Sequence, residues 1–296
     1  KEVSVGGEVW QSAKDLKLYI EDINGVAFST ADTYRDITVE EEGPLRTVIR
    51  VQGEMDASQD LRGAFAYDIR FHFYRNKSNI RIDPTITNLL PHTSDMVYNA
   101  EIRQVSLIFP GWMGRDSEDI VYVTSIGKQD SNNIWGSITS ILEKAGKHFK
   151  GQGKDFSMVQ TGDLCEITAD GEVTKMGRRG AGWTALEKGG RSIGAGIRYF
   201  WEEFPKGIEV NKDGDLSIHL WPIGDDVLVM GGGEAKRHEI HLTLGDSEPQ
   251  ELDGLIHPLL AVAPGEWYSE TEGFTDKLFP YSPDKLGLYE DVVEKG

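Results

Sequence analysis

The sequence contains a single cysteine, Cys165, among its 296 residues. One thiol excludes a disulfide within the chain and any zinc site that is built from several cysteines. We expect Cys165 to be a small buried hydrophobe in a strand rather than a nucleophile. The cysteine count does not settle the compartment.

Long hydrophobic runs are missing as well. No stretch approaches the roughly 20 apolar residues that a membrane-spanning helix needs, so we expect no membrane partner. The sequence shows no signal-peptide pattern and begins at Lys1, which indicates a mature or trimmed product.

Positive charge is scarce in this sequence. The 31 lysines and arginines stand against 49 aspartates and glutamates, which gives a formal net charge of -18. Proteins bind nucleic acid through basic surfaces, so this composition argues against such a partner. An acidic polymer would be repelled at long range, and binding one would require a local basic patch.

Alternation of apolar and polar residues is plentiful, and it is typical of strands. It is clearest at 67–74, where every second residue is large and apolar, and it returns at 80–86 after an Asn-rich turn. Further strands are expected at 16–20, 47–51, 101–110, 193–200, 216–221 and 240–244. Only 136–148 has the spacing of a helix.

About a dozen strands without intervening helices predict an all-β, mostly antiparallel fold. At this length, a large two-sheet sandwich with one short helix fits better than a small barrel. We assign 1–262 to the sandwich and 263–296 to an acidic, aromatic tail or linker. The segment 246–296 holds 12 acidic and 3 basic residues.

The segment 177–222 concentrates three tryptophans and several cations. Its tryptophans are Trp183, Trp201 and Trp221, and its cations include Arg178, Arg179, Arg191, Arg198 and Lys206. Flat aromatic rings and guanidinium groups suit the apolar faces and the acidic groups of sugars. The alternative is that the rings fill the sheet core and the cations form internal salt bridges. The sequence leaves both interpretations open.

Three shorter motifs carry weaker signals. Asn211–Asp215 resembles a fragment of a calcium loop, but an Asp-Gly hairpin turn explains it more simply. The histidines of Lys236-x-His238-x-x-His241 would point to opposite faces of a strand, so we expect no metal there. Gly190–Gly194 matches the nucleophile elbow of hydrolases, which requires a strand followed by a helix. Because each of these motifs lacks part of what its site requires, we expect no cofactor. Calcium is the one ion for which the sequence contains a partial motif, at Asn211–Asp215.

Several motifs together resemble the large β-domain of the exo-rhamnogalacturonan lyase-like proteins, which are polysaccharide lyases of fungi and bacteria. The motifs are G-P-L-R-x-V-x-R-V-x-G at 43–53, G-x-G-W at 180–183, RYFWEEFPK at 198–206, L-x-I-x-L-x-P at 216–222 and GEAKRHE at 233–239. The resemblance spans roughly residues 35–265. It implies a supersandwich of the galactose mutarotase type and an extracellular or periplasmic protein.

The resemblance also implies an activity, namely β-elimination at a uronic acid of a polysaccharide. Such a reaction needs a base for the C5 proton and cations that stabilise the carboxylate. Lys206 or His238 would be the base. The carboxylate and the sugar rings would be held by Arg178, Arg179, Arg198, Trp183, Trp201 and Trp221.

Two other functions remain open at this point. The family places an (α/α)-barrel domain after the β-domain, and the sequence ends where that domain would begin. The chain is therefore either a lyase-type domain or a non-catalytic carbohydrate-binding module. In a third interpretation it is a structural protein that self-associates through its C-terminal tail.

Overall fold

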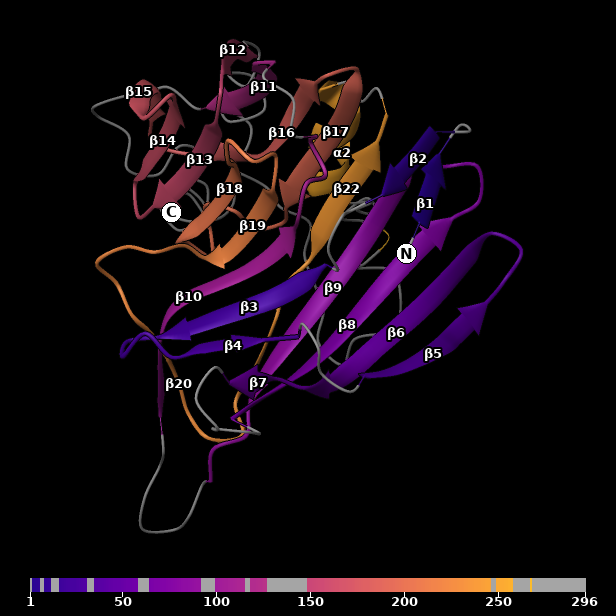
Figure 1. Cartoon of the computed structure of the whole chain (residues 1–296), viewed down its shortest axis with the longest axis vertical. Helices are drawn as coiled ribbons and strands as arrows, with labels where there is room; N and C mark the ends of the chain where they lie inside the picture. The colour runs from indigo at the N-terminus through magenta and orange to yellow at the C-terminus, as the bar shows by residue number, and fades with distance from the viewer. Residues whose placement is uncertain are drawn as a thin grey trace.

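The computed structural model describes residues 2–5, 8–11, 16–30, 35–57, 64–91, 99–114, 118–126, 148–245, 249–257 and 267. These residues form two large antiparallel sheets, a small separate hairpin and one short helix (Figure 1). The hairpin consists of β1 (Glu2–Val5) and β2 (Glu8–Gln11). The structure thus confirms the all-β fold class.

The first sheet has ten strands. Its order is β15 (Glu172–Gly177), β14 (Leu164–Ala169), β13 (Phe156–Thr161), β18 (Lys206–Val210), β19 (Leu216–Trp221), β10 (Ala100–Phe109), β3 (Lys17–Asp22), β4 (Ala27–Ser29) and β7 (Asp56–Ala57), and β20 (Leu228–Met230) also pairs with β10.

The second sheet also has ten strands. Its order is β12 (Phe149–Gly153), β11 (Ile120–Ile126), β16 (Gly180–Lys188), β17 (Arg191–Ile197), β22 (Ile240–Leu244), β9 (Asn79–Asn88), β8 (Phe65–Tyr74), β6 (Arg46–Glu54) and β5 (Arg35–Glu42), and β21 (Ala235–Arg237) also pairs with β9.

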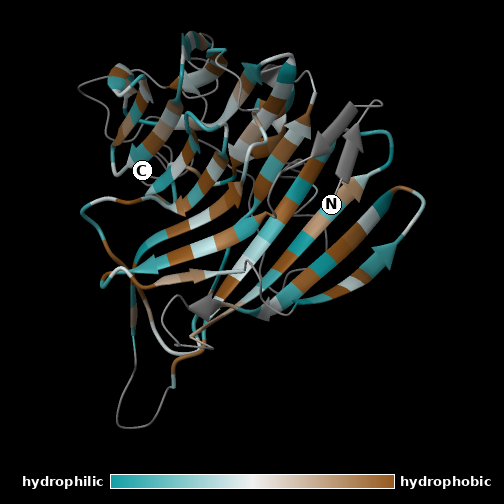
Figure 2. Cartoon of the chain, viewed as in Figure 1, coloured by the Kyte–Doolittle hydropathy of each residue, from teal (hydrophilic) through white to brown (hydrophobic). Residues whose placement is uncertain are grey.

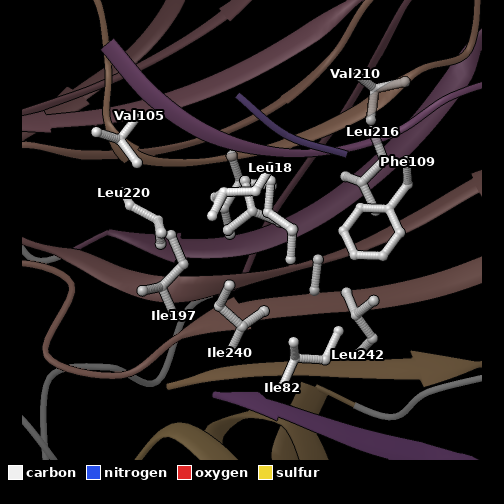
Figure 3. Close-up of a cluster of buried hydrophobic side chains, with 14 of the residues drawn as sticks. Leu18, Ile82, Val105, Phe109, Ile197, Val210, Leu216, Leu220, Ile240 and Leu242 are labelled. Atoms are coloured by element: carbon white, nitrogen blue, oxygen red, sulfur yellow. The ribbon is translucent and has the colours of Figure 1, made fainter. Parts of the chain in front are cut away.

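The core lies between the two sheets. Hydrophobic and polar residues alternate along most strands (Figure 2), so that one face of each sheet is apolar. Leu18, Val105 and Leu220 from the first sheet meet Ile82 and Ile240 from the second (Figure 3). Burying these branched side chains contributes about 1.5–3 kcal/mol each and drives the sheets together.

The helix α2 (Pro249–Ile256) covers part of the outer face of the second sheet, over β16, β17 and β22. It approaches closely because Gly194 and Gly196 have no side chains there. A Cβ at Gly196 would lie 2.5 Å from the Cδ1 of Ile256. Leu252, Ile256 and Trp183 form a small second core under this helix.

The expected strands are confirmed where the structure describes them, but the helix α2 was not expected from the sequence. The hairpin of β8 and β9 turns at Asn76, which has a φ of 57°. The strand expected at 193–200 is shorter, because β17 ends at Ile197 and the chain turns there. The helix expected at 136–148 lies outside the described residues except for its last residue, and so does the tail 263–296 except for Trp267. The division into sandwich and tail stays a prediction.

Cys165 lies buried in β14, as expected for a small hydrophobe. Burial, with a smaller effect of the charge on Glu166, raises the pKa of its thiol to about 12. Within the described part of the chain, no helix has the length and apolar character needed to cross a membrane.

Candidate functional site

The turn that joins β17 to β18, residues 198–206, is the centre of the candidate site. Phe200 anchors it, because its ring is buried against the backbone of Gly180 and Gly182. Tyr199 takes a left-handed conformation with a φ of 57° and is half exposed, as is Phe204. The chain therefore places one aromatic side chain of this turn in the core and two others at the surface.

Guanidinium groups stack on the aromatic rings of the 198–206 turn. The Cζ of Arg179 lies 3.9 Å from the ring centre of Trp201. The Cζ of Arg198 lies 5.0 Å from the ring centre of Tyr199. Such contacts contribute about 0.5–1 kcal/mol at exposed positions and fix the planes of both groups.

A buried glutamine holds the neighbouring strand in place. The Nε2 of Gln160 donates to the carbonyl oxygen of Arg178 at 2.9 Å, and its Oε1 accepts from the amide of Gly180 at 2.9 Å. Gln160 also pairs with Lys206 across β13 and β18. The side chain of Arg178 turns aside to bind Asp163 at 2.9 Å. Arg178 and Arg179 thus lie beside the turn, and Arg179 stacks on the ring of Trp201.

Lys206 and His238 lie close together in the interior. Lys206 is fully buried on the same face of β18 as the core residue Ile208, and its ammonium group donates to the carbonyl oxygens of Glu203 and Pro205. Burial, reinforced by the nearby charge of Lys236 and opposed by Glu203, lowers the pKa of Lys206 to about 8.

His238 is buried in the same way. Burial and the charges of Lys206 and Lys236 hold its pKa well below the ordinary value. Its Nδ1 lies 3.9 Å from a carboxylate oxygen of Glu203. The two bases expected from the sequence are therefore neighbours, and both are shielded from solvent.

Arg198 belongs to a network of ion pairs on the outer face of the second sheet. Its guanidinium group binds Glu239 at 3.1 Å, and Glu239 binds Arg81 at 3.0 Å. Arg81 in turn binds Asp83 at 2.8 Å. Burial pushes the pKa of Asp83 upward, but the hydrogen bonds from Arg81 and Arg237 outweigh it and hold the pKa below its usual value. This arrangement matches the salt-bridge interpretation of Arg198.

The other members of this network were not expected to act together, although His241 belongs to a motif noted in the sequence. His72 and His241 flank Arg81 in the register of β8, β9 and β22. His72 contacts Asp83 at 3.1 Å, and His241 contacts Glu239 at 3.0 Å. The network itself is indicated in the sequence by a charged residue at every second position, which is also the pattern of an ordinary solvated sheet face.

The three tryptophans have different environments. Trp183 is buried beneath α2, and its Nε1 donates to Asp253 at 3.0 Å. A ring enclosed in this way offers no free face to a ligand. Trp221 is half-buried at the end of β19, and its Nε1 donates to the carbonyl oxygen of Asp226 at 3.3 Å. Trp201 carries the stacked guanidinium group of Arg179.

The metal-binding motifs have structural roles in the part of the chain that is described. The Oδ1 of Asp215 accepts from the amide of Gly111 at 2.7 Å, and Asn211 caps the same turn. His238 faces the interior, whereas His241 binds Glu239. The described residues include no group of three or more metal-ligating side chains placed to hold an ion.

A family comparison agrees with the resemblance seen in the sequence. Residues 13–103 match the model of the PcRGLX-like protein central beta sandwich domain. This match confirms the resemblance to the rhamnogalacturonan lyase-like family and relates the chain to a carbohydrate-active β-sandwich domain. The matched segment runs from β3 into β10. No curated protein matches the chain.

Solved structures with similar folds have low sequence identity. The GH36 alpha-galactosidase AgaA from Geobacillus stearothermophilus is 11% identical, with a TM-score of 0.43 over 77% of this chain and 30% of its own. The alpha-galactosidase from Lactobacillus brevis is 9% identical, with a TM-score of 0.43 over 82% and 30%.

A third similar structure is a putative aldose 1-epimerase from Klebsiella pneumoniae. It is 10% identical, with a TM-score of 0.39 over 86% of this chain and 62% of its own. The chain studied here thus spans about a third of the length of the two galactosidases.

Proposed function

We propose that this chain is a polysaccharide lyase-like domain that binds a uronic-acid-containing polysaccharide at the 198–206 turn. The observation that carries the proposal is the stacking of Arg179 on Trp201 beside the exposed rings of Tyr199 and Phe204. Sugar rings pack their apolar faces on aromatic side chains, and guanidinium groups bind carboxylates bidentately. The turn and the neighbouring Arg179 together offer both kinds of group.

Arg179 is the cation best placed to meet a sugar carboxylate. Within the described part of the chain it pairs with no carboxylate, and its plane is fixed on Trp201. Arg178 and Arg198 are compensated by Asp163 and Glu239 and would have to exchange these partners for a ligand. Arg179 therefore carries the binding role in this proposal, with Arg178 and Arg198 in support.

Catalysis is the second candidate, and the lowered pKa of Lys206 favours it. A lysine with a pKa of about 8 is neutral in about a tenth of the molecules at pH 7, far more often than an ordinary lysine, and the neutral amine can accept a proton. In β-elimination the base would remove the C5 proton of the uronic acid. The electron pair would then form the C4–C5 double bond, and the C4–O bond would break with its electron pair going to the leaving oxygen, which takes a proton from solvent. Because Lys206 and His238 are buried, this reaction also requires the 198–206 turn to open.

The test is titration calorimetry with galacturonan oligosaccharides. We expect Arg179→Ala and Trp201→Ala each to weaken binding at least about tenfold, or 1.4 kcal/mol. The control is Arg103→Ala, which removes the same charge from an exposed arginine on β10. Equal affinity in all three variants, or no binding by the unmodified protein, would refute the proposed site.

Catalysis is tested separately by ultraviolet absorbance of the unsaturated product. An active lyase would produce this absorbance, and Lys206→Met would abolish it. Retention on the polysaccharide without product would assign the chain to the binding modules. Neither retention nor product, together with large oligomers in light scattering, would favour the structural alternative.

A further inference from the structure

The outer face of the first sheet carries a second polar surface, well away from the core. Thr168, Ser157, Glu209 and Ser217 lie side by side across β14, β13, β18 and β19, because their registers align. Their chain neighbours, such as Phe156 and Ile208, point into the core. The sheet therefore presents a row of hydroxyl groups and one carboxylate.

A chain of hydrogen bonds fixes that carboxylate. The hydroxyl of Ser106 lies 2.7 Å from the Nδ1 of His219, and the Nε2 of His219 lies 3.1 Å from the Oε2 of Glu209. Because a carboxylate only accepts, Nε2 is the donor, and in the neutral imidazole Nδ1 then accepts from Ser106. Gln104 donates to the oxygen of Ser106 at 2.9 Å. Every donor in this chain points toward Glu209.

The residues at the inner end of this series of hydrogen bonds are buried, and the carboxylate at its outer end reaches solvent. Ser106 is fully buried and His219 is 7% exposed, whereas the side chain of Glu209 is 45% exposed. Gly207 gives the imidazole its space, since a Cβ there would lie 3.2 Å from the Cδ2 of His219. Buried groups thus orient a carboxylate that still reaches solvent. The hydrogen bond from His219 lowers the pKa of Glu209 and keeps it ionised.

Glu209 lines an open cavity of about 440 Å³. Ser157 and Thr168 contribute hydroxyl groups, 2.7 Å apart, and Asn211 contributes an amide. This volume lies within the roughly 300–1,000 Å³ of small-molecule sites. The cavity also carries Asp155 and Asp213, and Lys212 is the cation among its lining residues. Three carboxylates against one ammonium group would repel an anion.

We infer that this cavity binds an uncharged sugar residue, whose hydroxyl groups donate to Glu209 and exchange hydrogen bonds with Ser157, Thr168 and Asn211. His219 and Ser106 are positioning residues that hold the carboxylate. This site differs from the 198–206 turn in location and in the charge that it accepts, so it does not depend on the proposed function.

The experiment compares two probes that differ at one carbon, methyl galactoside and methyl galacturonide. Imidazole signals of His219 are followed by NMR up to roughly 50 mM sugar, where a site of millimolar Kd is saturated. We expect the neutral galactoside to shift these signals and the galacturonide to bind at least about tenfold more weakly. Galacturonan binding through Arg179 is measured separately, so either proposal can fail alone.

The variants are Glu209→Gln and a matched control, Glu172→Gln. The glutamine keeps an oxygen that accepts from His219, so the fold is preserved, but the charged acceptor is lost. We expect Glu209→Gln to bind the galactoside at least about tenfold more weakly than the unmodified protein. The difference in affinity between the galactoside and the galacturonide should also become smaller. Glu172 is an exposed residue on β15 of the same sheet, and its replacement should change neither the galactoside affinity nor the preference over the galacturonide.

The positioning role is tested with Ser106→Ala. Removing the donor to Nδ1 should weaken galactoside binding about threefold and mix the two imidazole tautomers, which the ¹⁵N shifts of His219 report. An unchanged tautomer with unchanged affinity would refute the role of Ser106. The site itself is refuted if the galactoside causes no shift, if the galacturonide binds as well, if Glu209→Gln has no effect, or if only calcium moves the signals.

Discussion

Lys206 shows how a single residue can couple the candidate site to the stability of the fold. Its ammonium group holds the carbonyl oxygens of the 198–206 turn, yet it lies in an apolar interior. Burial favours the neutral amine, which explains the pKa of about 8. The same burial that prepares a base therefore also makes the folded state sensitive to pH.

The stability of the protein is expected to rise with pH between about 8 and 10.5 because of Lys206. The unfolded chain keeps this lysine protonated up to 10.5, whereas the folded protein releases the proton near 8. The unfolded state binds more protons in this window, so raising the pH favours folding, by up to about 3 kcal/mol. Urea unfolding at pH 8 and pH 10 measures this rise.

The variant Lys206→Met should lack this increase. The control Lys150→Met, on an exposed position of β12, should retain it. The buried thiol of Cys165 acts in the opposite direction above its ordinary pKa of 9.0, but it is present in every variant and cancels from the comparison. The same pH dependence in Lys206→Met as in the unmodified protein would show that Lys206 is not the group responsible.

At the scale of elements, the 198–206 turn is set by how closely β16 approaches it. Gly182 lies on β16 with a φ of 75°, directly under Phe200. A Cβ at this position would lie 2.6 Å from the Cβ of Phe200 and 2.9 Å from the carbonyl oxygen of Ile197. Neither atom can move without moving the backbone, so the turn can pack here only over a glycine.

Gly182→Ala is expected to destabilise the protein by at least about 2 kcal/mol through this contact. It should also weaken galacturonan binding, because it displaces the turn that carries Trp201. Chemical denaturation and calorimetry measure the two effects. Gly224→Ala, where a Cβ meets nothing within 4 Å, should stay within about 0.5 kcal/mol. Comparable losses in both variants would contradict the packing argument.

At the scale of the whole molecule, the net charge of -18 works against an acidic ligand. The attraction at Arg179 is local, whereas the repulsion from the rest of the protein acts at long range. The local attraction and the long-range repulsion can be separated experimentally, because salt weakens electrostatic interactions over long distances more than those at close contact. A polyanion must therefore cross an unfavourable field before it reaches a favourable contact.

Association with galacturonan oligosaccharides should become faster when salt is raised from about 0.01 M to 0.15 M, where the screening length falls from about 30 Å to 8 Å. Stopped-flow fluorescence of the tryptophans measures the rate. A neutral galactan oligosaccharide serves as the control, and its rate should not change. A rate that falls with salt would mean that a positive surface steers the ligand, contrary to this account.

The sequence alone determined the fold class and most strands, because alternation with a period of two reports directly which face of a strand is buried. It located the hairpin of β8 and β9, the buried Cys165 and a family resemblance over roughly residues 35–265, whereas the family model matches residues 13–103. It also selected Arg179, Trp201 and Lys206 as residues of interest. These are properties of single segments, and the chain carries them before it folds.

Only the tertiary structure decided which of these residues act together. No pattern in the sequence indicates that Trp183 lies under α2, that Arg198 is compensated by Glu239, or that Ser106 meets His219 across 113 positions. Such contacts depend on the order and register of strands that are distant in the chain. Alternation determines which face of the sheet a side chain lies on, but not which side chain it contacts. Those contacts decide whether a charged group forms an ion pair within the fold or can bind a ligand.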